Sequence, residues 1–411
     1  MQKAILVGIN TGTRGITEES SEETLNELSA LAETAGAETV ATVIQNRQLI
    51  EPATLIGKGK LEEVCELCRI HNPDYVIFDD ELSGSQVRNL EEATGVTVLD
   101  RSRLILDIFA ERATSGEGKC QVELAQLKYM LPRLSGIGAS LSRQGGGIGS
   151  RGPGETKLET DKRHIQARIN KLRADLKEIE KHRGIMRSQR LKTGVKSVAI
   201  VGYTNAGKST LINTLTDAGT VSEDKLFCTL DPLTKKMRIE DELDVVFTDT
   251  VGFIRKLPHH LVEAFKSTLE ESVYADLILH VVDASSPEFE THMMVVNNLL
   301  SELGAGGKPV IVALNKADKA ENIPNVANSV VISAKTGEGV SELLHMIKTA
   351  LEPSKKRVRL LIPYTDGAVT SFVYERCKIE SENHTENGCE LVVTAENEYF
   401  PKIERYVIDE L

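Results

Sequence analysis

The stretch VKSVAIVGYTNAGKSTLINTL, residues 195–215, decides the fold. An apolar strand runs into Gly202, the motif G-x-x-x-x-G-K-S extends from there to Ser209, and an amphipathic helix follows. Glycines let backbone N–H groups curl around phosphates, Lys208 reaches the β- and γ-phosphate oxygens, and the Ser209 hydroxyl coordinates Mg²⁺. Because the motif stands between a strand and a helix, as its mechanism requires, it predicts a phosphate-binding loop in an α/β domain.

Two later segments supply the groups that a hydrolysed nucleotide needs. Thr229, in FCTLDP (227–232), is expected to close over the γ-phosphate and Mg²⁺; Thr234 competes for this role, but the spacing favours Thr229. Asp249 ends the strand DVVFTD and would hold Mg²⁺ through water, while the amide of Gly252 senses the γ-phosphate. The pattern D-x-x-G has little value alone, so its position and order are the evidence.

The base is expected to be guanine. Asn315-Lys316-Ala317-Asp318 follows the apolar strand PVIVAL, and Asp318 can accept two hydrogen bonds from the N1–H and 2-amino groups of guanine. Adenine has no matching pair of donors, and a buried carboxylate left unpaired is costly, so this side chain should select guanine. Ser333-Ala334-Lys335 follows VVI, where a backbone amide would meet the guanine O6. The set predicts a GTP site and GTP hydrolysis.

The residues expected in the site come from five segments of the chain. The candidate nucleotide-binding residues are Gly202, Tyr203, Thr204, Asn205, Ala206, Gly207, Lys208, Ser209, Thr210, Phe227, Cys228, Thr229, Leu230, Asp231, Asp249, Thr250, Val251, Gly252, Asn315, Lys316, Asp318, Ser333, Ala334 and Lys335. The candidate Mg²⁺ ligands are Ser209, Thr229 and Asp249, and the candidate catalytic residues are Lys208, Thr229 and Gly252.

One catalytic group is missing from the expected position. Many signalling GTPases place a water-orienting glutamine directly after D-x-x-G, and here Phe253 stands there. A phenyl ring can neither orient water nor donate to developing charge, so slow hydrolysis is expected until a partner supplies the missing group or orders the switch. Arg255, His259 and His260 follow nearby, and we expect them to be solvated switch residues rather than catalysts.

Chain length, cysteine content and the search for targeting and membrane-spanning segments limit the class of protein. A chain of 411 residues is too long for one ordinary core. Six cysteines are too sparse for a disulfide framework, and Cys65 and Cys68 are expected to be ordinary helix cysteines rather than a redox motif or half of a zinc site. Without a signal-peptide pattern or a membrane-spanning apolar run, we expect a cytoplasmic protein that does not enter membranes. We further expect a monomer that does not bind DNA.

We expect a multidomain α/β fold. The domains predicted are an α/β domain with a mainly parallel sheet (1–112), a helical hairpin with a glycine-rich tip (113–192), a GTPase domain (193–353) and a small α+β domain (354–411) that includes strands at KKRVRLLIPY, SFVYERCKI and CELVVTA. In the hairpin, helices are predicted at 118–134 and from Glu155 to about Arg187. The second carries an apolar stripe typical of an antiparallel coiled coil, although a helix packed on a domain surface would also explain it. Its members are Leu158, Ile165, Ile169, Leu172, Leu176, Ile179 and Met186.

The predicted hairpin carries a net positive charge, in contrast to the chain as a whole. The whole chain has a net charge of -12, but residues 133–192 hold 15 Lys and Arg against 6 Asp and Glu, a local +9. This segment contains SRQGGGIGSRGPGETKLE (142–159), which is either a flexible linker or a tip that lays backbone amides and arginines against phosphate. Two other basic stretches are open to a similar choice: Ile56–Lys60 is a plain turn or a phosphate contact, and Lys355–Arg357 is solvated or touches RNA.

The chain resembles the HflX family of ribosome-associated GTPases over nearly its whole length. The resemblance is carried by LILDIFAERATSGEGKCQVELAQLKYMLPRL, GGGIGSRGPGETKLETDKR, GYTNAGKST, FCTLDP and DTVGFI, of which the glycine-rich segment with GPGETKLE is specific to the family. It implies a GTPase that uses Mg²⁺, binds the large ribosomal subunit and its rRNA, and splits stalled or idle ribosomes. It also implies ATP binding, for which the N-terminal domain carries no sharp motif.

That resemblance favours rRNA contact over a linker for the glycine-rich tip. Gly145, Gly146, Gly147 and Gly149 permit close backbone approach, and Arg143 and Arg151 supply forked donors. Two other functions stay open: a ribosome-hibernation or assembly factor that uses GTP mainly as a conformational ligand, and a signalling switch with a protein effector.

Overall fold

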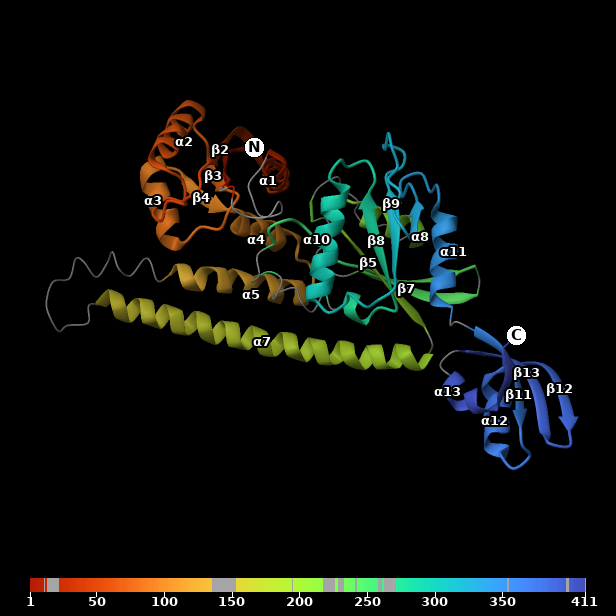
Figure 1. Ribbon diagram of the computed structural model, residues 1–411. Coiled ribbons are helices and arrows are strands. Elements are labelled where there is room, and N and C mark those ends of the chain that lie inside the picture. The colour runs from red at the N-terminus through yellow and green to blue at the C-terminus, as the bar shows by residue number, and fades with distance from the viewer. Residues whose placement is uncertain are drawn as a thin grey trace. The chain divides into compact units, whose positions relative to one another are not determined.

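The computed structural model describes most of the chain (Figure 1). The described residues are 1–10, 12, 22–134, 153–193, 195–216, 226–227, 233–240, 242–257, 261, 269, 271–352, 355–396 and 399–410; within these, nothing is said of the side chains of 153–158, 187, 189–193, 355, 396 and 410. Two compact units are distinguished, Met1–His345 and Met346–Leu411. No described helix is both long and apolar enough to cross a bilayer.

The first unit begins with a four-stranded parallel sheet in the order β2-β1-β3-β4. Its strands are β1 (Gln2–Asn10), β2 (Ala37–Asn46), β3 (Tyr75–Phe78) and β4 (Thr97–Asp100). Its helices are α1 (Glu22–Thr34), α2 (Lys58–His71), α3 (Gly84–Thr94) and α4 (Arg101–Arg112). The expected parallel α/β domain is therefore confirmed.

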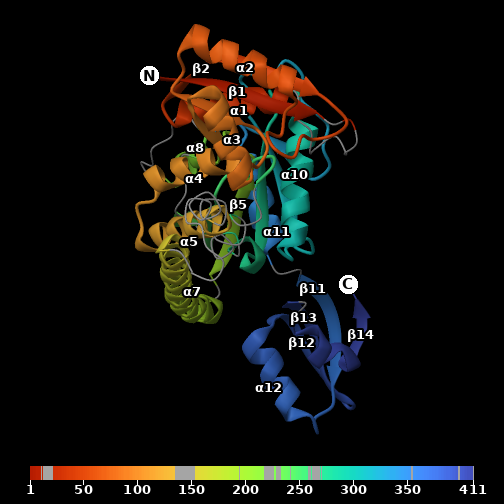
Figure 2. The ribbon, with the colours of Figure 1, turned by 90° about the vertical axis from the view of Figure 1, so that its left-hand side faces the viewer.

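Alternation along β1 explains how the helices divide between the two faces of this sheet. Ala4 and Leu6 contribute to a core that contains the apolar residues of α1 and α4, whereas Ile5 and Val7 contribute to a second core with those of α2 and α3. Successive side chains of a strand point to opposite faces, so a strand that is apolar throughout is covered on both. Figure 2 shows α1, α2 and α3 with the strands β1 and β2 of this domain from a second side.

Two helices form a hairpin after this sheet. The first, α5 (Gly116–Arg133), contacts the second, α7 (Pro153–Thr193), and both views show them side by side. Ile169 and Leu172 are buried against Leu124, with Ile165 and Leu176 packed around them, so the predicted stripe is confirmed there. It does not extend to Met186, which is 63% exposed. The two helices are antiparallel, and the start of α5 at Gly116 does not reach the part of α7 in which Met186 lies. The glycine-rich tip with Arg143 and Arg151 lies outside the described residues.

A six-stranded sheet follows, in the order β10-β9-β8-β5-β7-β6. Five strands are parallel and β6 pairs antiparallel with β7. The strands are β5 (Lys196–Gly202), β6 (Thr234–Ile239), β7 (Leu243–Asp249), β8 (Leu277–Asp283), β9 (Val310–Asn315) and β10 (Ser329–Val331). The helices include α8 (Lys208–Thr216), α10 (Phe289–Glu302) and α11 (Val340–Leu351), within which the second unit begins.

The second unit is a four-stranded antiparallel sheet in the order β12-β13-β11-β14. Its elements are β11 (Lys355–Ile362), α12 (Gly367–Arg376), β12 (Lys378–Thr385), β13 (Gly388–Glu396), α13 (Phe400–Ile403) and β14 (Val407–Glu410). The strand predicted at SFVYERCKI is wrong for its first six residues, which belong to α12. Val373 is buried in the core of this unit, and the backbone N–H of Cys377 donates to the Val373 carbonyl at the end of the helix. Tertiary packing therefore overrides the preference of the β-branched and aromatic residues in this run for a strand.

Candidate nucleotide-binding site

The loop between β5 and α8 depends on glycine at both ends of its motif. A Cβ on Gly202 would lie 2.3 Å from the carbonyl oxygen of Val281 on the neighbouring strand. Gly207 has a φ of +93°, and a Cβ there would lie 2.2 Å from Nδ2 of Asn315. Any side chain at either position would displace backbone or the asparagine, so both glycines are required by packing as well as by access for phosphate.

Lys208 brings a cation to the start of α8. Its side chain is buried, and Nζ donates to the carbonyl oxygens of Gly202 at 3.0 Å and Tyr203 at 2.9 Å. These bonds hold the ammonium inside the loop, next to a helix N-terminus whose amides also favour anions. A cation and backbone donors therefore converge at one point, as the binding of a polyphosphate demands.

The residues expected to hold Mg²⁺ fit that ion. The Ser209 hydroxyl donates to Oδ2 of Asp249 at 3.2 Å, and Asp249 is only 1% exposed at the end of β7. A hydroxyl and a carboxylate are hard oxygen ligands, which Mg²⁺ prefers and which it often meets through water. Two of the three predicted ligands thus lie together, while Thr229 lies outside the described residues together with Cys228, Leu230 and Asp231.

Gly252 lies against the phosphate-binding loop. A Cβ there would be 2.8 Å from Cγ2 of Thr204 and 3.1 Å from Nζ of Lys208, so only glycine allows this approach. Among the described residues the buried Thr204 hydroxyl has no hydrogen-bond partner, and Thr204 lies against Gly252, so this hydroxyl is a candidate donor to a phosphate oxygen. Thr250, by contrast, turns inward and donates to the Ile200 carbonyl at 2.7 Å.

Phe253 has its ring in the core of the GTPase domain rather than beside the phosphates. It is 1% exposed and packs with Val201, Leu269 and Val296. Its backbone meets the phosphate-binding loop, because its N–H donates to Gly202 at 3.1 Å and its carbonyl accepts from the Thr204 N–H at 2.7 Å. The backbone of Phe253 therefore ties the segment after Asp249 to the phosphate-binding loop, while its side chain is enclosed by the core.

The expectation that Arg255 is solvated is wrong. Its side chain is 8% exposed and its guanidinium pairs with Glu288, at the start of α10. A guanidinium that cannot lose its charge can be buried only beside such a partner, which explains the difference. His259 and His260 lie outside the described residues.

Asn315 joins the phosphate loop to the base-recognition segments. Its Nδ2 donates to the Ala206 carbonyl at 2.8 Å, and its Oδ1 accepts from the Ala334 amide at 2.9 Å. The next residue, Lys316, pairs with Asp283 at the end of β8, with 2.7 Å between Nζ and Oδ2. Three loops that are far apart in sequence thus meet at one asparagine.

Asp318 is held in place by Ser333. The buried Ser333 hydroxyl donates to Oδ1 of Asp318 at 2.7 Å, and this hydrogen bond lowers the pKa of the Asp318 carboxyl, which is therefore ionised as an acceptor. Asp318 itself is exposed, contrary to the buried acceptor assumed from sequence, since it lies in the turn that follows β9. Lys335 is exposed beside the turn and Ala334 is buried.

Tyr203 was predicted only as a loop residue, but its side chain connects the loop to the N-terminal domain. The hydroxyl bonds to Glu27 of α1, and the ring stacks on His292 of α10 with 3.9 Å between ring centroids. Glu27 in turn pairs with Arg101 of α4. Burial and the neighbouring Glu27 raise the pKa of the tyrosine, so it remains a neutral donor.

Lys256 makes a second connection that the sequence did not reveal. Its Nζ lies 2.6 Å from Oδ2 of Asp79 and 3.1 Å from Oδ1 of Asp80, both of which follow β3. Asp79 is fully buried and also pairs with Arg101 at 2.8 Å. Adjacent aspartates after a buried strand are the only signal in the sequence, and nothing in it identifies a lysine 177 residues away as their partner.

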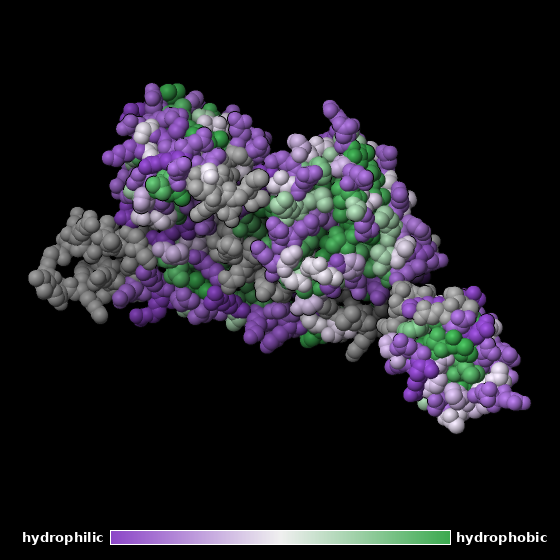
Figure 3. All heavy atoms as spheres, viewed as in Figure 1, coloured by the Kyte–Doolittle hydropathy of each residue, from purple (hydrophilic) through white to green (hydrophobic). Residues whose placement is uncertain are grey.

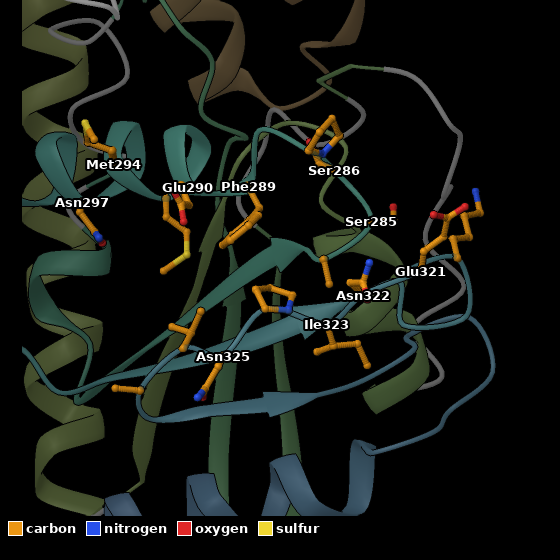
Figure 4. A pocket seen from close by; sticks show the side chains of 17 residues that line it. Ser285, Ser286, Phe289, Glu290, Met294, Asn297, Glu321, Asn322, Ile323 and Asn325 are labelled. Atoms are coloured by element: carbon orange, nitrogen blue, oxygen red, sulfur yellow. The ribbon is translucent and has the colours of Figure 1, made fainter.

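A cavity of about 1150 Å³ lies beside the base-recognition segment, but no residue predicted to contact the nucleotide lines it (Figure 4). It lies between α10 and the segment that follows Lys319, where Phe289, Met293 and Ile323 contribute apolar wall. Figure 3 shows apolar surface beside α10. The cavity is therefore separate from the proposed phosphate and base contacts.

The N-terminal candidates have ordinary structural roles where they are described. The amide of Gly57 is taken by Oε1 of Gln45 at 2.9 Å, so it is occupied within the protein, which favours the plain turn. Cys65 donates to the Ala93 carbonyl at 3.4 Å and Cys68 is buried on α2, in keeping with helix cysteines. In the second unit, Arg357 of the basic stretch Lys355–Arg357 pairs with Glu380 at 2.7 Å.

Four family descriptions match successive parts of the chain. They are "GTP-binding GTPase N-terminal" at residues 22–110, "GTP-binding GTPase Middle Region" at 112–190, "50S ribosome-binding GTPase" at 197–316 and "HflX C-terminal domain" at 315–405. The last begins at Asn315, well before the boundary at 353 and 354 expected from sequence.

Curated relatives match over nearly the full length. The protein named GTPase HflX of Caldanaerobacter subterraneus subsp. tengcongensis is 50% identical over 408 residues, which cover 99% of this chain and 94% of that one. GTPase HflX of Escherichia coli K12 is 40% identical over 395 residues, covering 94% and 92%. A solved structure described as the SsGBP and GDP complex is 26% identical with a TM-score of 0.46, covering 85% of this chain and 98% of that one.

Proposed function

The chain belongs to the HflX family of GTPases and is a GTP hydrolase, and from this premise we propose that it binds the large ribosomal subunit and separates stalled or idle ribosomes. In this proposal hydrolysis is slow in the isolated protein and accelerated on the ribosome. A protein of this function works in the cytoplasm, in part bound to ribosomes, and we propose that it does so as a monomer.

The burial of Phe253 is the observation that carries the proposed dependence on a partner. A glutamine at this position in other GTPases orients the attacking water, whereas the phenyl ring is packed into the core and its backbone is tied to Gly202 and Thr204. Rotation of the side chain cannot bring a polar group to the γ-phosphate. The missing contribution must therefore come from elsewhere, either from a ribosomal group or from a segment that the ribosome orders.

We assign the nucleotide contacts to the residues predicted from sequence, and we add that Thr204 contributes its side-chain hydroxyl. Lys208, Gly252 and the Thr204 hydroxyl would surround the phosphates, and Asp318 would accept from guanine. Ser209 and Asp249 would hold Mg²⁺, which supplies positive charge to the β- and γ-phosphates when bound. The proposal does not extend to ATP at the N-terminal domain, because the turn amide of Gly57 is already taken by Gln45.

Contact with the large subunit is assigned to the hairpin. The local charge of +9 in residues 133–192, set against -12 for the whole chain, gives one cationic region on an acidic protein. Such a region attracts the phosphates of RNA without making the rest of the protein bind nonspecifically. This supports the family description "50S ribosome-binding GTPase" as a description of this chain also.

Hydrolysis and subunit separation should be measured together. GTP turnover is followed with no addition, with small subunits, with large subunits and with whole ribosomes, and light scattering reports separation of the whole ribosomes. We expect large subunits to raise turnover by about 10² or more, and separation to occur with GTP or its nonhydrolysable analogue but not with GDP. Lys208→Ala should remove turnover in every condition. Binding without stimulation or separation would favour a hibernation or assembly role, and no ribosome binding in any nucleotide state would favour a signalling switch.

A further inference from the structure

The hairpin of β12 and β13 carries three side chains of the kinds that bind transition metals. Within the described part of the chain, ligand atoms of Glu382, His384 and Cys389 lie within 4.8 Å of one another. His384 and Cys389 are directly opposite in the antiparallel pairing, and Glu382 is two residues before His384 on the same strand. Opposed residues and residues two apart share one face, so the strand geometry itself brings the three together.

The distances fit a tetrahedral ion. Oε1 of Glu382 lies 3.2 Å from Nε2 of His384 and 3.7 Å from Sγ of Cys389. For tetrahedral Zn²⁺ with ordinary bond lengths, an oxygen ligand lies about 3.3 Å from a nitrogen ligand and about 3.5 Å from a sulfur ligand. The carboxylate oxygen is therefore already placed as one corner with respect to the other two.

Neighbouring groups hold these ligands in position. The Tyr374 hydroxyl of α12 hydrogen-bonds to Glu382, and the Tyr364 ring stacks on the His384 imidazole with 6.3 Å between ring centroids. Tyr364 is itself fixed, because its hydroxyl donates to the Thr385 carbonyl at 2.9 Å. Hydrogen bonds and packing of this type orient the ligands of metal sites.

The site is open on one side. His384 and Cys389 line a cavity of about 550 Å³ whose other wall is formed by residues of α12 and by Tyr364. His384 is 67% exposed in its side chain while Cys389 is buried, so the imidazole meets solvent and the thiol lies at the inner end. Three protein ligands beside a cavity leave a fourth corner for water or another small ligand, the pattern of an open zinc site.

We propose that Glu382, His384 and Cys389 form a binding site for Zn²⁺ in the second unit, with an exchangeable fourth ligand in the adjoining cavity. The sulfur, nitrogen and oxygen donor set suits Zn²⁺ better than Mg²⁺ or Ca²⁺, which take oxygen ligands. Binding replaces a proton: the thiol that now donates to Glu382 becomes a thiolate, the Zn–S bond forms, and one H⁺ passes to the buffer. The site is independent of GTP hydrolysis.

Cobalt titration of the full-length protein without nucleotide tests the proposal. One equivalent of Co²⁺ should give the intense visible bands of a tetrahedral site and a thiolate-to-cobalt charge-transfer band, and Zn²⁺ should displace it. Titration calorimetry of Zn²⁺ in buffers of different ionisation enthalpy should report about one proton released. Absence of a thiolate band, or binding without proton release, would overturn the proposal and leave only a hydrogen-bonded cluster.

Variants assign the ligands. Cys389→Ser should abolish the charge-transfer band, and His384→Ala and Glu382→Gln should weaken Zn²⁺ binding by more than about 100-fold, since loss of outer partners alone costs 10–100-fold. Cys377→Ser, which removes a cysteine of the same unit outside the cluster, and the double change Cys65→Ser with Cys68→Ser should leave the band unchanged. A band that survives Cys389→Ser but disappears in the double variant would place the metal on α2 instead. His384→Ala keeps the test valid if the buried cysteine cannot be replaced, because that imidazole is exposed.

Discussion

The side chain of Asn315 donates to the Ala206 carbonyl at 2.8 Å and fills the space that a Cβ on Gly207 would need. One carboxamide thereby positions the phosphate-binding loop and, through its oxygen, the turn at Ala334. Asp318 lies three residues after Asn315 and accepts a hydrogen bond from the hydroxyl of Ser333, the residue before Ala334. Base recognition is consequently aligned with phosphate binding by direct hydrogen bonds rather than by the sheet alone.

Replacement of Asp318 by asparagine should change the preferred base. The variant keeps one acceptor oxygen but replaces the other with an NH₂ group, which meets the 2-amino donor of guanine unfavourably and can donate to the 2-oxo group of xanthine. We expect affinity for GTP to fall by about 10² or more and xanthosine triphosphate to become the better ligand. Competition binding with fluorescent nucleotides measures both. Because Asp318 is exposed, the melting temperature should stay unchanged, and an unchanged preference for GTP would contradict this account of selectivity.

Phe253→Gln should not restore a catalytic glutamine. The side chain points into a core formed with Val201, Leu269 and Val296, so the change buries an amide and removes an aromatic ring. The free energy of unfolding should fall by about 3–5 kcal/mol, while the rate of GTP hydrolysis per folded molecule does not rise. Urea unfolding and single-turnover kinetics measure these quantities. Phe253→Leu is the control, with a smaller loss of stability; a tenfold faster rate in the glutamine variant would show that the ring can leave the core.

Residues adjacent in sequence were predictable, because their chemistry depends on local order. The loop from Gly202 to Ser209 was predicted from the strand before it and the helix after it. The parallel sheets were predicted from apolar strands that alternate with helices. Asp249 and Ser209 were assigned to one ion from motifs alone, and their side chains are 3.2 Å apart.

Contacts between distant segments were not predictable. The bond between Tyr203 and Glu27 joins residues 176 positions apart, and nothing in either local pattern distinguishes that glutamate from the other acidic residues of its helix. The burial of Arg255 likewise depends on a partner supplied by a different element. The run that begins at Ser371 was misassigned for the same reason, since its aromatic and β-branched residues favour a strand until packing of Val373 is known.

Lys256→Ala should destabilise the first unit through Asp79. The aspartate is fully buried between Lys256 and Arg101, so removal of the lysine leaves a buried charge with less compensation. We expect the free energy of unfolding to fall by about 1–3 kcal/mol. A double-mutant cycle with Asp79→Asn, measured by urea unfolding, should give a coupling energy of about 1 kcal/mol or more. Lys319→Ala removes an exposed lysine as the control, and additive effects in the cycle would mean that the two residues do not interact.

Acid should destabilise the GTPase domain through His280. Burial on β8, reinforced by the Lys208 ammonium, lowers the pKa of this imidazole to about 4 from 6.5. The folded state therefore binds fewer protons than the unfolded state between these values, and the stability present above pH 6.5 is lost as pH falls toward 4. This shift corresponds to about 3 kcal/mol, of which about 2 kcal/mol is lost by pH 5. His292, whose pKa is lowered in the same way, adds to the loss.

Urea unfolding at pH 7.5 and pH 5 isolates the share of His280. His280→Gln should show a loss between the two pH values that is about 2 kcal/mol smaller than that of the unchanged protein. Exposed His345 provides the control, and His345→Gln should retain the full loss. Equal pH dependence in the His280 variant and the unchanged protein would exclude this imidazole as the cause.

Replacement of Arg143 and Arg151 by alanine should weaken binding to the large ribosomal subunit in a salt-dependent way. If each arginine neutralises one phosphate, the slope of log K against log salt should become less negative by about 0.7–0.9 for each. Co-sedimentation across a salt titration gives the slope, and intrinsic GTP hydrolysis serves to show that the nucleotide site is intact. Arg69→Ala with Lys319→Ala removes two exposed cations elsewhere and should leave the slope unchanged. A slope equal to that of the unchanged protein in the hairpin variant would mean that the glycine-rich tip is a linker rather than an RNA contact.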